Sequence, residues 1–197
     1  MANPTYDALK QTTISPQGCY LMDAFNPTAV SADSPATQAM TDLSRVPPAT
    51  IGSDVTLEEA NRSMIMRGVR LLPVVADNRI IGLITSADIL GEKPFLLAQR
   101  RQSTPRELRV ADVMVPVEQV EALAIEDVRK ANVGHIVATL RADGRAHALV
   151  FGHDKQGKQV LVGIFSASQI ARQLGVHIQT YEMARTFAEI EAVIAAA

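Results

Sequence analysis

The amino-acid sequence predicts an α/β (α+β) fold of two β-α-β-β-α units, with an N-terminal arm before them and a C-terminal helix after them. One observation is an internal repeat, since GLITSADIL at residues 82–90 returns as GIFSASQIA at residues 163–171. The other is the alternation of helix-periodic stretches with short apolar runs, which indicates a mixed fold. The expected segments are an arm at 1–33, units at 34–91 and 104–176, a linker at 92–103 and a terminal helix at 177–197.

The first helix of each unit follows from the alignment of residues 56–75 with residues 132–151, at a constant offset of 76 (132 − 56). Apolar residues recur on one helix face in both copies. They are Leu57, Ala60 and Met64 in the first copy and Val133, Ile136 and Leu140 in the second. Thr56 and Glu59 fit a capping box, and Asn132 can cap the second helix. Gly68 and Gly144 stand where a left-handed residue ends a helix.

Each of these helices is followed by a predicted β-hairpin and a second helix. LLPVV and IIGLI flank the polar turn ADNR, and AHALVF and VLVGIF flank the longer turn GHDKQGKQ. The second helices are expected from about Ser86 and about Ala167, and short leading strands near residues 49–51 and 119–123. The pairs Ser34-Pro35 and Thr104-Pro105 each predict a further helical segment, because proline is favoured at the first helical position.

The C-terminal stretch at residues 181–197 has the pattern of an amphipathic helix. Phe187, Ile190 and Ile194 recur at helical spacing and form one apolar stripe. Packing against the core is the expected role of this stripe, and an oligomer contact is the alternative.

Composition and charge narrow the class of protein. The formal net charge is −2, which gives no electrostatic case for binding nucleic acid or an anionic membrane. Cys19 is the single cysteine, so no intramolecular disulfide can form. Residues 1–18 lack the regions of a signal peptide, and no apolar run approaches the roughly 18 residues of a membrane span. We therefore expect a cytoplasmic protein.

The first copy resembles a known family at GVRLLPVV (residues 68–75) and GLITSADIL. The order apolar-Pro-Val-Val, a short turn, and Gly-apolar-apolar-Thr-x-x-Asp is similar to a cystathionine-β-synthase (CBS) domain. Two copies over residues 35–176 resemble a CBS pair, or Bateman module, with the second supported mainly by its register with the first. The resemblance implies units packed about a pseudo-twofold axis, a regulatory and non-enzymatic role, a homodimer, and a ligand such as AMP, ADP, ATP or S-adenosylmethionine between the units.

The resemblance also implies which residues contact the ligand. The Asp88 carboxylate would accept hydrogen bonds from ribose hydroxyls, Thr85 would hold ribose or phosphate, and Arg70 would approach phosphate. The implied ligand-binding residues are Thr50, Ile51, Arg70, Leu72, Pro73, Thr85, Ser86 and Asp88. Physical chemistry supports the assignment, since a carboxylate accepts from two hydroxyls and an arginine or a helix start attracts phosphate. A plainer alternative stays open, in which Thr85 or Ser86 caps the second helix and Asp88 lies in its first turn.

The second copy departs from this pattern. Gln169 stands at the position of Asp88, and Ala146 stands at that of Arg70, so the second copy lacks both the carboxylate and the cation. We expect one competent site centred on Asp88. The second site is expected to be empty, weak or altered in specificity, and comprises Ala146, His147, Ser166 and Gln169.

The remaining motifs give no catalytic signature. His147, His153 and Asp154 match no metal-binding motif and are interpreted as turn and surface residues. Two functions are left open. One is a sensor that binds an adenosine-containing ligand and signals to a separate effector protein. The other is a ligand-independent dimerisation or interaction scaffold with a vestigial nucleotide site.

Overall fold

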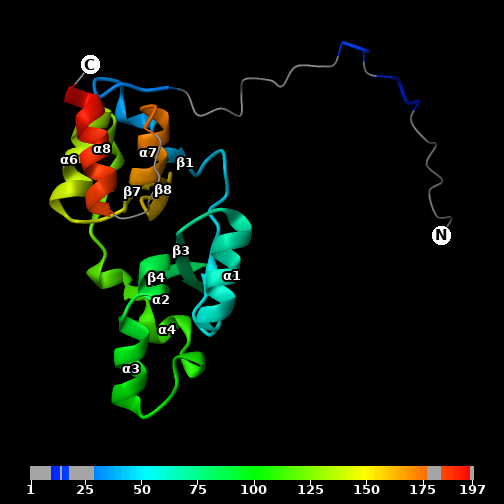
Figure 1. The fold of residues 1–197 in the computed structure, drawn as a ribbon, viewed down its shortest axis with the longest axis vertical. Coiled ribbons are helices and arrows are strands. Elements are labelled where there is room, and N and C mark those ends of the chain that lie inside the picture. Colours follow the sequence, from blue (N-terminus) through cyan, green and yellow to red (C-terminus); the bar gives the residue numbers. More distant parts are fainter. Residues whose placement is uncertain (1–9, 14, 18–28, 177–182, 196–197) are drawn as a thin grey trace.

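The computed structural model of the protein describes residues 10–13, 15–17, 29–176 and 183–195. Within them the chain forms two four-stranded sheets, each packed with helices (Figure 1). The first sheet has the order β2-β3-β4-β5 and contains β2 (Ile51–Gly52), β3 (Leu71–Ala76), β4 (Arg79–Thr85) and β5 (Val115–Pro116). The second has the order β1-β8-β7-β6 and contains β1 (Thr41–Asp42), β8 (Gln159–Ser166), β7 (His147–His153) and β6 (Ala122–Ala124). The predicted α/β (α+β) fold of two related units is confirmed.

The helices follow the predicted order in both units. In and around the first unit they are α1 (Leu57–Arg67), α2 (Ser86–Leu90), α3 (Lys93–Arg101) and α4 (Val110–Val113). In the second they are α5 (Ile125–Val128), α6 (Val133–Ala142), α7 (Ala167–Gln173) and α8 (Met183–Ala195). Short 3-10 helices are η2 (Ala36–Gln38), η3 (Pro105–Glu107) and η4 (Val117–Gln119). In each unit the leading strand is parallel to the first hairpin strand, and the hairpin strands are antiparallel.

The first helix of each unit is capped from its own sequence. Thr56 N–H donates to Glu59 Oε2 (3.1 Å) and Glu59 N–H donates to Thr56 Oγ1 (3.2 Å), which confirms the capping box. In the second copy an imidazole takes the place of the Glu59 carboxylate, because Asn132 N–H donates to His135 Nδ1 (3.1 Å). The two helices therefore start at equivalent positions with different chemistry.

Left-handed residues mark the ends of helices and the tight turns. Gly68 (φ 64°) ends α1 and Gly144 (φ 60°) follows α6, as predicted. The β3–β4 turn is formed by Asp77 (φ 47°) and Asn78 (φ 60°), both in the left-handed conformation that suits a two-residue hairpin. The longer β7–β8 loop instead folds around Asp154, whose carboxylate accepts from loop backbone N–H groups at 2.8 and 2.9 Å.

Each sheet is completed by a strand from the other half of the chain. β1 lies in the first half of the chain but pairs with β8, where Thr41 lies opposite Ile164. β5 follows the first unit but pairs back with β4, where Val115 lies opposite Leu83. We call this arrangement the edge-strand exchange.

Gly82 and Gly163 of the repeated motif allow the exchanged strands to approach. A Cβ atom on Gly82 would lie 2.7 Å from the Val115 carbonyl oxygen and 2.8 Å from Met114 Sδ. A Cβ atom on Gly163 would collide with the side chain of Met40, which precedes β1. Both motif glycines are therefore explained by close packing against an incoming edge strand.

The hydrophobic cores follow the edge-strand exchange rather than the predicted boundaries at 34–91 and 104–176. Ala36 is fully buried in the core of the second unit, and Val110 is fully buried in the core of the first. The prediction of a helix after Ser34-Pro35 is largely wrong, because only the three residues of η2 are helical. The chain extends at Thr41 instead, where it completes the second sheet.

The segments that flank the second unit also differ in part from expectation. The predicted polar linker contains α3, whose Ala98 is buried in the first core. The C-terminal helix is present as α8, and burial of Phe187 and Ile190 in the second core confirms that its stripe packs internally. Most of the predicted arm, and residues 177–182 and 196–197 of the terminal segment, lie outside the described residues.

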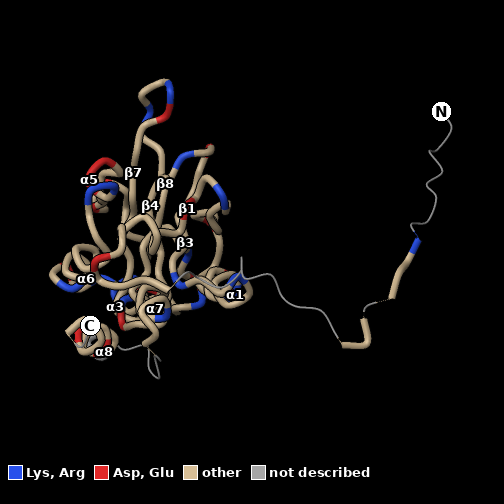
Figure 2. Tube along the Cα trace, turned by 90° about the horizontal axis from the view of Figure 1, so that it is seen from above, with Lys and Arg blue, Asp and Glu red and all other residues tan. Residues whose placement is uncertain are grey.

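Charged residues are spread over both units. Figure 2 shows basic and acidic positions interspersed around the folded part of the chain. This distribution agrees with the small net charge of −2. None of the described helices has the length and apolar character needed to cross a membrane.

Candidate functional site: a cavity between the two units

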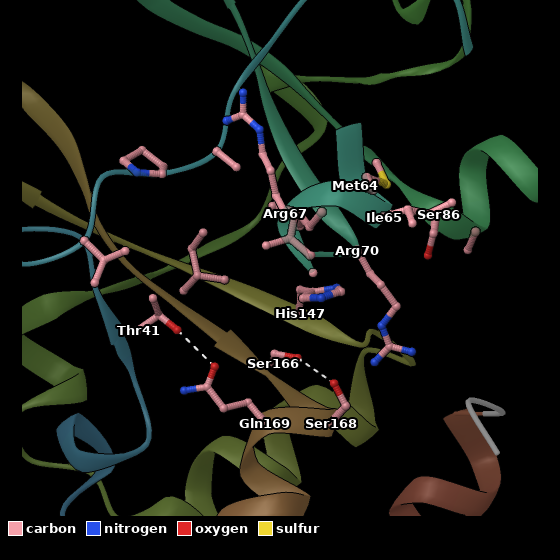
Figure 3. A pocket seen from close by; sticks show the side chains of 18 of the residues that line it. Thr41, Met64, Ile65, Arg67, Arg70, Ser86, His147, Ser166, Ser168 and Gln169 are labelled. Atoms are coloured by element: carbon pink, nitrogen blue, oxygen red, sulfur yellow. Dashed lines mark hydrogen bonds between the residues drawn. The ribbon is translucent and has the colours of Figure 1, made fainter. Parts of the chain in front are cut away.

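A cavity of about 1290 Å³ lies between the two units, with walls from both copies of the repeat (Figure 3). The end of α1, the start of β3 and α2 form one side, and β7, β8 and α7 form the other. A third wall is the segment from β1 to β2, residues 43–49, which we call the strap. The strap residues that line the cavity are Leu43, Val46, Pro47, Pro48 and Ala49.

Among the described residues, the charged side chains that line the cavity are all basic. Arg67, Arg70 and Arg172 line the cavity, and none of the described lining residues is Asp or Glu. Arg67 and Arg70 come from the end of α1 and the residue before β3, and Arg172 comes from α7. Three guanidinium groups in the lining favour an anionic ligand.

Arg70 is positioned by a joint that both units share. The Arg70 carbonyl accepts from Ser86 N–H at 2.9 Å, which ties the start of β3 to the start of α2. The equivalent bond in the second unit joins Ala167 N–H to the Ala146 carbonyl, also at 2.9 Å. The fold therefore builds the same joint twice, but only the first copy carries an arginine there.

His147 lies beside Arg70 but comes from the opposite unit, at the start of β7 (Figure 3). Burial lowers the pKa of His147 from 6.5 to about 4, and the positive charge of Arg70 adds to the effect. The imidazole is therefore neutral at neutral pH. A neutral ring can offer one donor and one acceptor and does not compete with Arg70 for an anion.

Asp88 caps α2 in this structure. Its Oδ2 accepts from Thr85 N–H (2.9 Å) and from Thr85 Oγ1 (2.6 Å), while Oδ1 lies 3.9 Å from Lys93 Nζ. Asp88 N–H donates to Thr85 Oγ1 (3.2 Å), so a complete capping box is formed. The plainer alternative left open by the sequence is thus present, and it leaves Oδ1 without a short hydrogen bond among the described residues.

The predicted site residues are divided between the cavity and its surroundings. Arg70 and Ser86 from the first predicted site line the same cavity as His147, Ser166 and Gln169 from the second. The others are not among its lining residues: Thr50, Ile51, Leu72, Pro73, Thr85, Asp88 and Ala146. Leu72 is fully buried in the first core, so its side chain cannot reach a ligand there. Residues expected in two separate sites therefore meet in one cavity.

Several lining residues were not predicted. Arg67 precedes Arg70 by three residues, and Arg172 follows Gln169 by three residues on α7. The helical spacing of Arg172 from Gln169 was visible, but which side chains of α1 and α7 face the cavity depends on how the two units pack. The strap gave no signal, since its Val-Pro-Pro-Ala sequence indicates only an extended connection.

Polar residues of the second copy that line the cavity interact with other side chains of the protein. Thr41 Oγ1 donates to Gln169 Oε1 at 3.1 Å, and the hydroxyls of Ser166 and Ser168 are 3.0 Å apart (Figure 3). Ser166 forms no side-chain cap on α7, in contrast to Thr85 on α2. Gln169 thus contacts β1 rather than closing a capping box.

The described residues contain no group of three or more His, Cys, Asp or Glu side chains arranged to hold a metal ion. Asp154 of the predicted turn cluster instead organises the β7–β8 loop, and His153 is exposed at the end of β7. The chemistry available in the cavity is therefore that of arginine, neutral imidazole, hydroxyl and amide groups, which is suited to binding.

Comparison with known sequences identifies the first unit. Residues 36–94 match the family model described as CBS domain. The uncharacterized protein MK0525 of Methanopyrus kandleri is 40% identical over 58 residues, which are 29% of this chain and 30% of that protein. The uncharacterized protein MJ0653 of Methanocaldococcus jannaschii is 34% identical over 64 residues, covering 31% and 33% of the two chains. The matched part is thus about a third of these curated relatives.

Comparison with solved structures covers both units. An uncharacterized conserved protein from Pyrococcus horikoshii is similar with a TM-score of 0.52 and 19% identity, over 77% of this chain and 99% of that one. CBSX2, solved in complex with AMP, is similar with a TM-score of 0.50 and 21% identity, over 71% of this chain and 94% of that one. At these identities the comparisons show a shared fold.

Proposed function

Since this chain is a tandem CBS-domain protein, we propose that it is a regulatory module that binds an adenosine-containing nucleotide between its units and signals to a separate effector protein. The AMP complex of the structurally similar CBSX2 supports the ligand class. The ligand changes the relation between the units only to the extent that it binds one arrangement more tightly than another.

The one-sided charge of the cavity is the observation that carries this proposal. A phosphate monoester bears about −1.5 to −2 charges at pH 7. Arg67, Arg70 and Arg172 offer this charge three guanidinium groups with no lining carboxylate among the described residues. The apolar strap and Ile65 supply surface for a flat base, and Ser86 and Ser166 supply hydroxyls. The lining thus offers cationic groups to the phosphate, apolar surface to the base and hydroxyl groups to the sugar.

The phosphate contact is tested by Arg70→Gln, with Arg79→Gln as the matched control. Arg79 is exposed at the hairpin turn, the far end of β3 and β4 from the cavity. Losing a charge-assisted hydrogen bond costs about 1.5–3 kcal/mol, so Arg70→Gln should weaken AMP or ATP binding roughly 10- to 100-fold. Arg79→Gln should bind like the parent. Calorimetry with AMP, ADP, ATP, S-adenosylmethionine and adenosine measures both variants.

Thermal unfolding gives an independent measure of the same function. A ligand at about 100 times its Kd should stabilise the protein by roughly 2.7 kcal/mol. For a chain of this size the melting temperature should rise by about 5–10 °C. No rise with any of the five compounds would refute an adenosyl sensor.

Asp88 is part of the proposal as the ribose contact. Oδ2 can keep the cap of α2 while Oδ1, whose nearest cation is Lys93 at 3.9 Å, accepts from a ribose hydroxyl. AMP and 2′-deoxy-AMP should then differ in affinity in the parent, and this difference should shrink in Asp88→Asn. Equal sensitivity to the missing hydroxyl in both proteins would remove Asp88 from the site and leave the phosphate contact untouched.

A second candidate function, a dimerisation scaffold, is favoured by an exposed apolar face on the first unit. Met66 and Ile65 at the end of α1 are 80% and 72% exposed, and Leu90 on α2 and Phe95 on α3 are 68% and 65% exposed. Exposed apolar side chains on helices that contact one another favour a protein contact site. A second copy of the chain is the occupant we propose, and homodimer formation is compatible with either function.

Sedimentation with and without AMP separates the two candidates. Met66→Glu and Phe95→Glu should convert a dimer to a monomer, whereas Val193→Glu on α8 should not. A dimer that forms without ligand and binds none of the five compounds would favour the scaffold. A monomeric parent at all accessible concentrations would exclude the proposed dimer.

A further inference from the structure

The motif of the second copy and the short strand that pairs with its sheet differ from their counterparts in the first unit at two positions that touch each other. Gln169 stands where the first copy has Asp88, since each follows its motif glycine by six residues (169 − 163 and 88 − 82). Thr41 occupies in β1 the place that Val115 occupies in β5. Relative to the first unit, an amide therefore stands in place of a carboxylate, and a threonine in place of a valine.

These two differences create one hydrogen bond that the first copy lacks. Thr41 Oγ1 donates to Gln169 Oε1 at 3.1 Å, on the wall of the cavity (Figure 3). Val115 has no hydroxyl to donate, and Asp88 is engaged in the cap of α2. The bond joins residues 128 positions apart and is partly buried, so it ties α7 directly to the exchanged strand β1.

Because β1 is short, a single side-chain hydrogen bond contributes much to holding it in place. The strand is two residues long, and the chain beyond it is held to β8 by Leu43 N–H, which donates to the Val162 carbonyl at 3.1 Å. The strap begins at that same residue and forms a wall of the cavity. An interaction that holds β1 against β8 therefore also holds the start of the strap in place.

We propose that Gln169 is a positioning residue that clamps Thr41, so that the second copy uses its motif to hold the cavity wall rather than to contact a ribose. The clamp gives the amide at position 169 a structural role. Gln169 accepts from Thr41 without placing a negative charge in a cavity lined by arginines, as a second Asp would.

The clamp is tested without ligand by hydrogen exchange at the Leu43 amide. Thr41→Val and Gln169→Met each remove the bond with little change in shape, and should speed exchange roughly three- to tenfold. Thr41→Ser keeps the hydroxyl and should exchange like the parent. The double variant should be no faster than either single one, because both remove the same bond. Thr139→Val, which deletes an exposed hydroxyl on α6, is the control.

Unchanged exchange at Leu43 in Thr41→Val, or additive effects in the double variant, would overturn the clamp. A second measurement asks whether the clamp positions the ligand wall, and this part rests on the proposed function. AMP should bind several-fold more weakly to Thr41→Val and normally to Thr41→Ser. Equal AMP affinity in the two variants would refute the positioning role. Absence of AMP binding by the parent would refute the function proposed above, while the ligand-free exchange result would still decide the clamp.

Discussion

Replacing Gly82 by alanine should destabilise the protein by about 1–3 kcal/mol, because the added methyl group overpacks β4 against β5. The new Cβ would lie 2.8 Å from Met114 Sδ and 2.7 Å from the Val115 carbonyl oxygen. The sulfur belongs to a flexible side chain and can move. The carbonyl belongs to the backbone of the strand paired with β4, so full relief requires β5 to separate from the sheet.

Urea unfolding followed by circular dichroism measures this loss, and two other glycines calibrate it. The three atoms nearest to the added Cβ of Gly163→Ala all belong to the flexible Met40 side chain, so this substitution should cost less than Gly82→Ala. Gly134 lies in α6 with a nearest neighbour at 3.4 Å from its added Cβ, the carbonyl oxygen of Ala32, which is an ordinary contact. Gly134→Ala should therefore stabilise the protein by about 0.5–1 kcal/mol through helix propensity.

Double-mutant cycles with the two methionines sharpen the test. Met40→Ala should relieve nearly all the strain of Gly163→Ala, whereas Met114→Ala should relieve only part of that of Gly82→Ala. If Gly82→Ala is as stable as the parent, or is rescued completely by Met114→Ala, the backbone approach of β5 is not the reason for the glycine.

Two further predictions concern protonation and capping. The pKa of His147 is about 4 in the folded protein and 6.5 unperturbed, so the unfolded chain takes up a proton first as pH falls. The free energy of unfolding should therefore decline as the pH falls from about 6.5 to about 4. Unfolding curves taken at several pH values should show a smaller decline for His147→Gln. The same pH dependence in this variant and the parent would contradict the prediction. Thr56→Ala removes the hydroxyl that accepts from Glu59 N–H at 3.2 Å and donates to Glu59 Oε2 at 2.7 Å, and should cost about 1 kcal/mol in urea unfolding. Thr104→Ala, whose box opens only the three residues of η3, should cost less.

The repeated elements could be predicted because their signals are local. The Thr56–Glu59 box, the left-handed glycines and the polar hairpin turns each act over a few residues and appear in the sequence as such. α3 was not predicted because it is short and buries little more than Pro94 and Ala98, while its Phe95 and Leu96 side chains stay exposed. The exchanged strands are two residues long, too short for any periodicity to mark them.

The site was predicted less completely because it depends on how the two units face each other. Sequence register placed Arg70 and His147 in different sites, but the packing of the units brings both into one cavity. Asp88 was correctly located at the start of a helix, and its cap on α2 is the consequence. The register of a repeat carries no information about a ligand contact of Asp88 Oδ1.

The edge-strand exchange has a consequence for the ancestry of the protein. A single repeat on its own would lack one edge strand and would present another with nothing to pair with, since β1 completes the second sheet and β5 the first. Two separate copies could complete each other's sheets by exchanging these strands. Duplication and fusion of such a gene would yield a chain in which the former subunits remain interlaced, and cutting it between residues 103 and 104 should release fragments that reassociate rather than two independent domains.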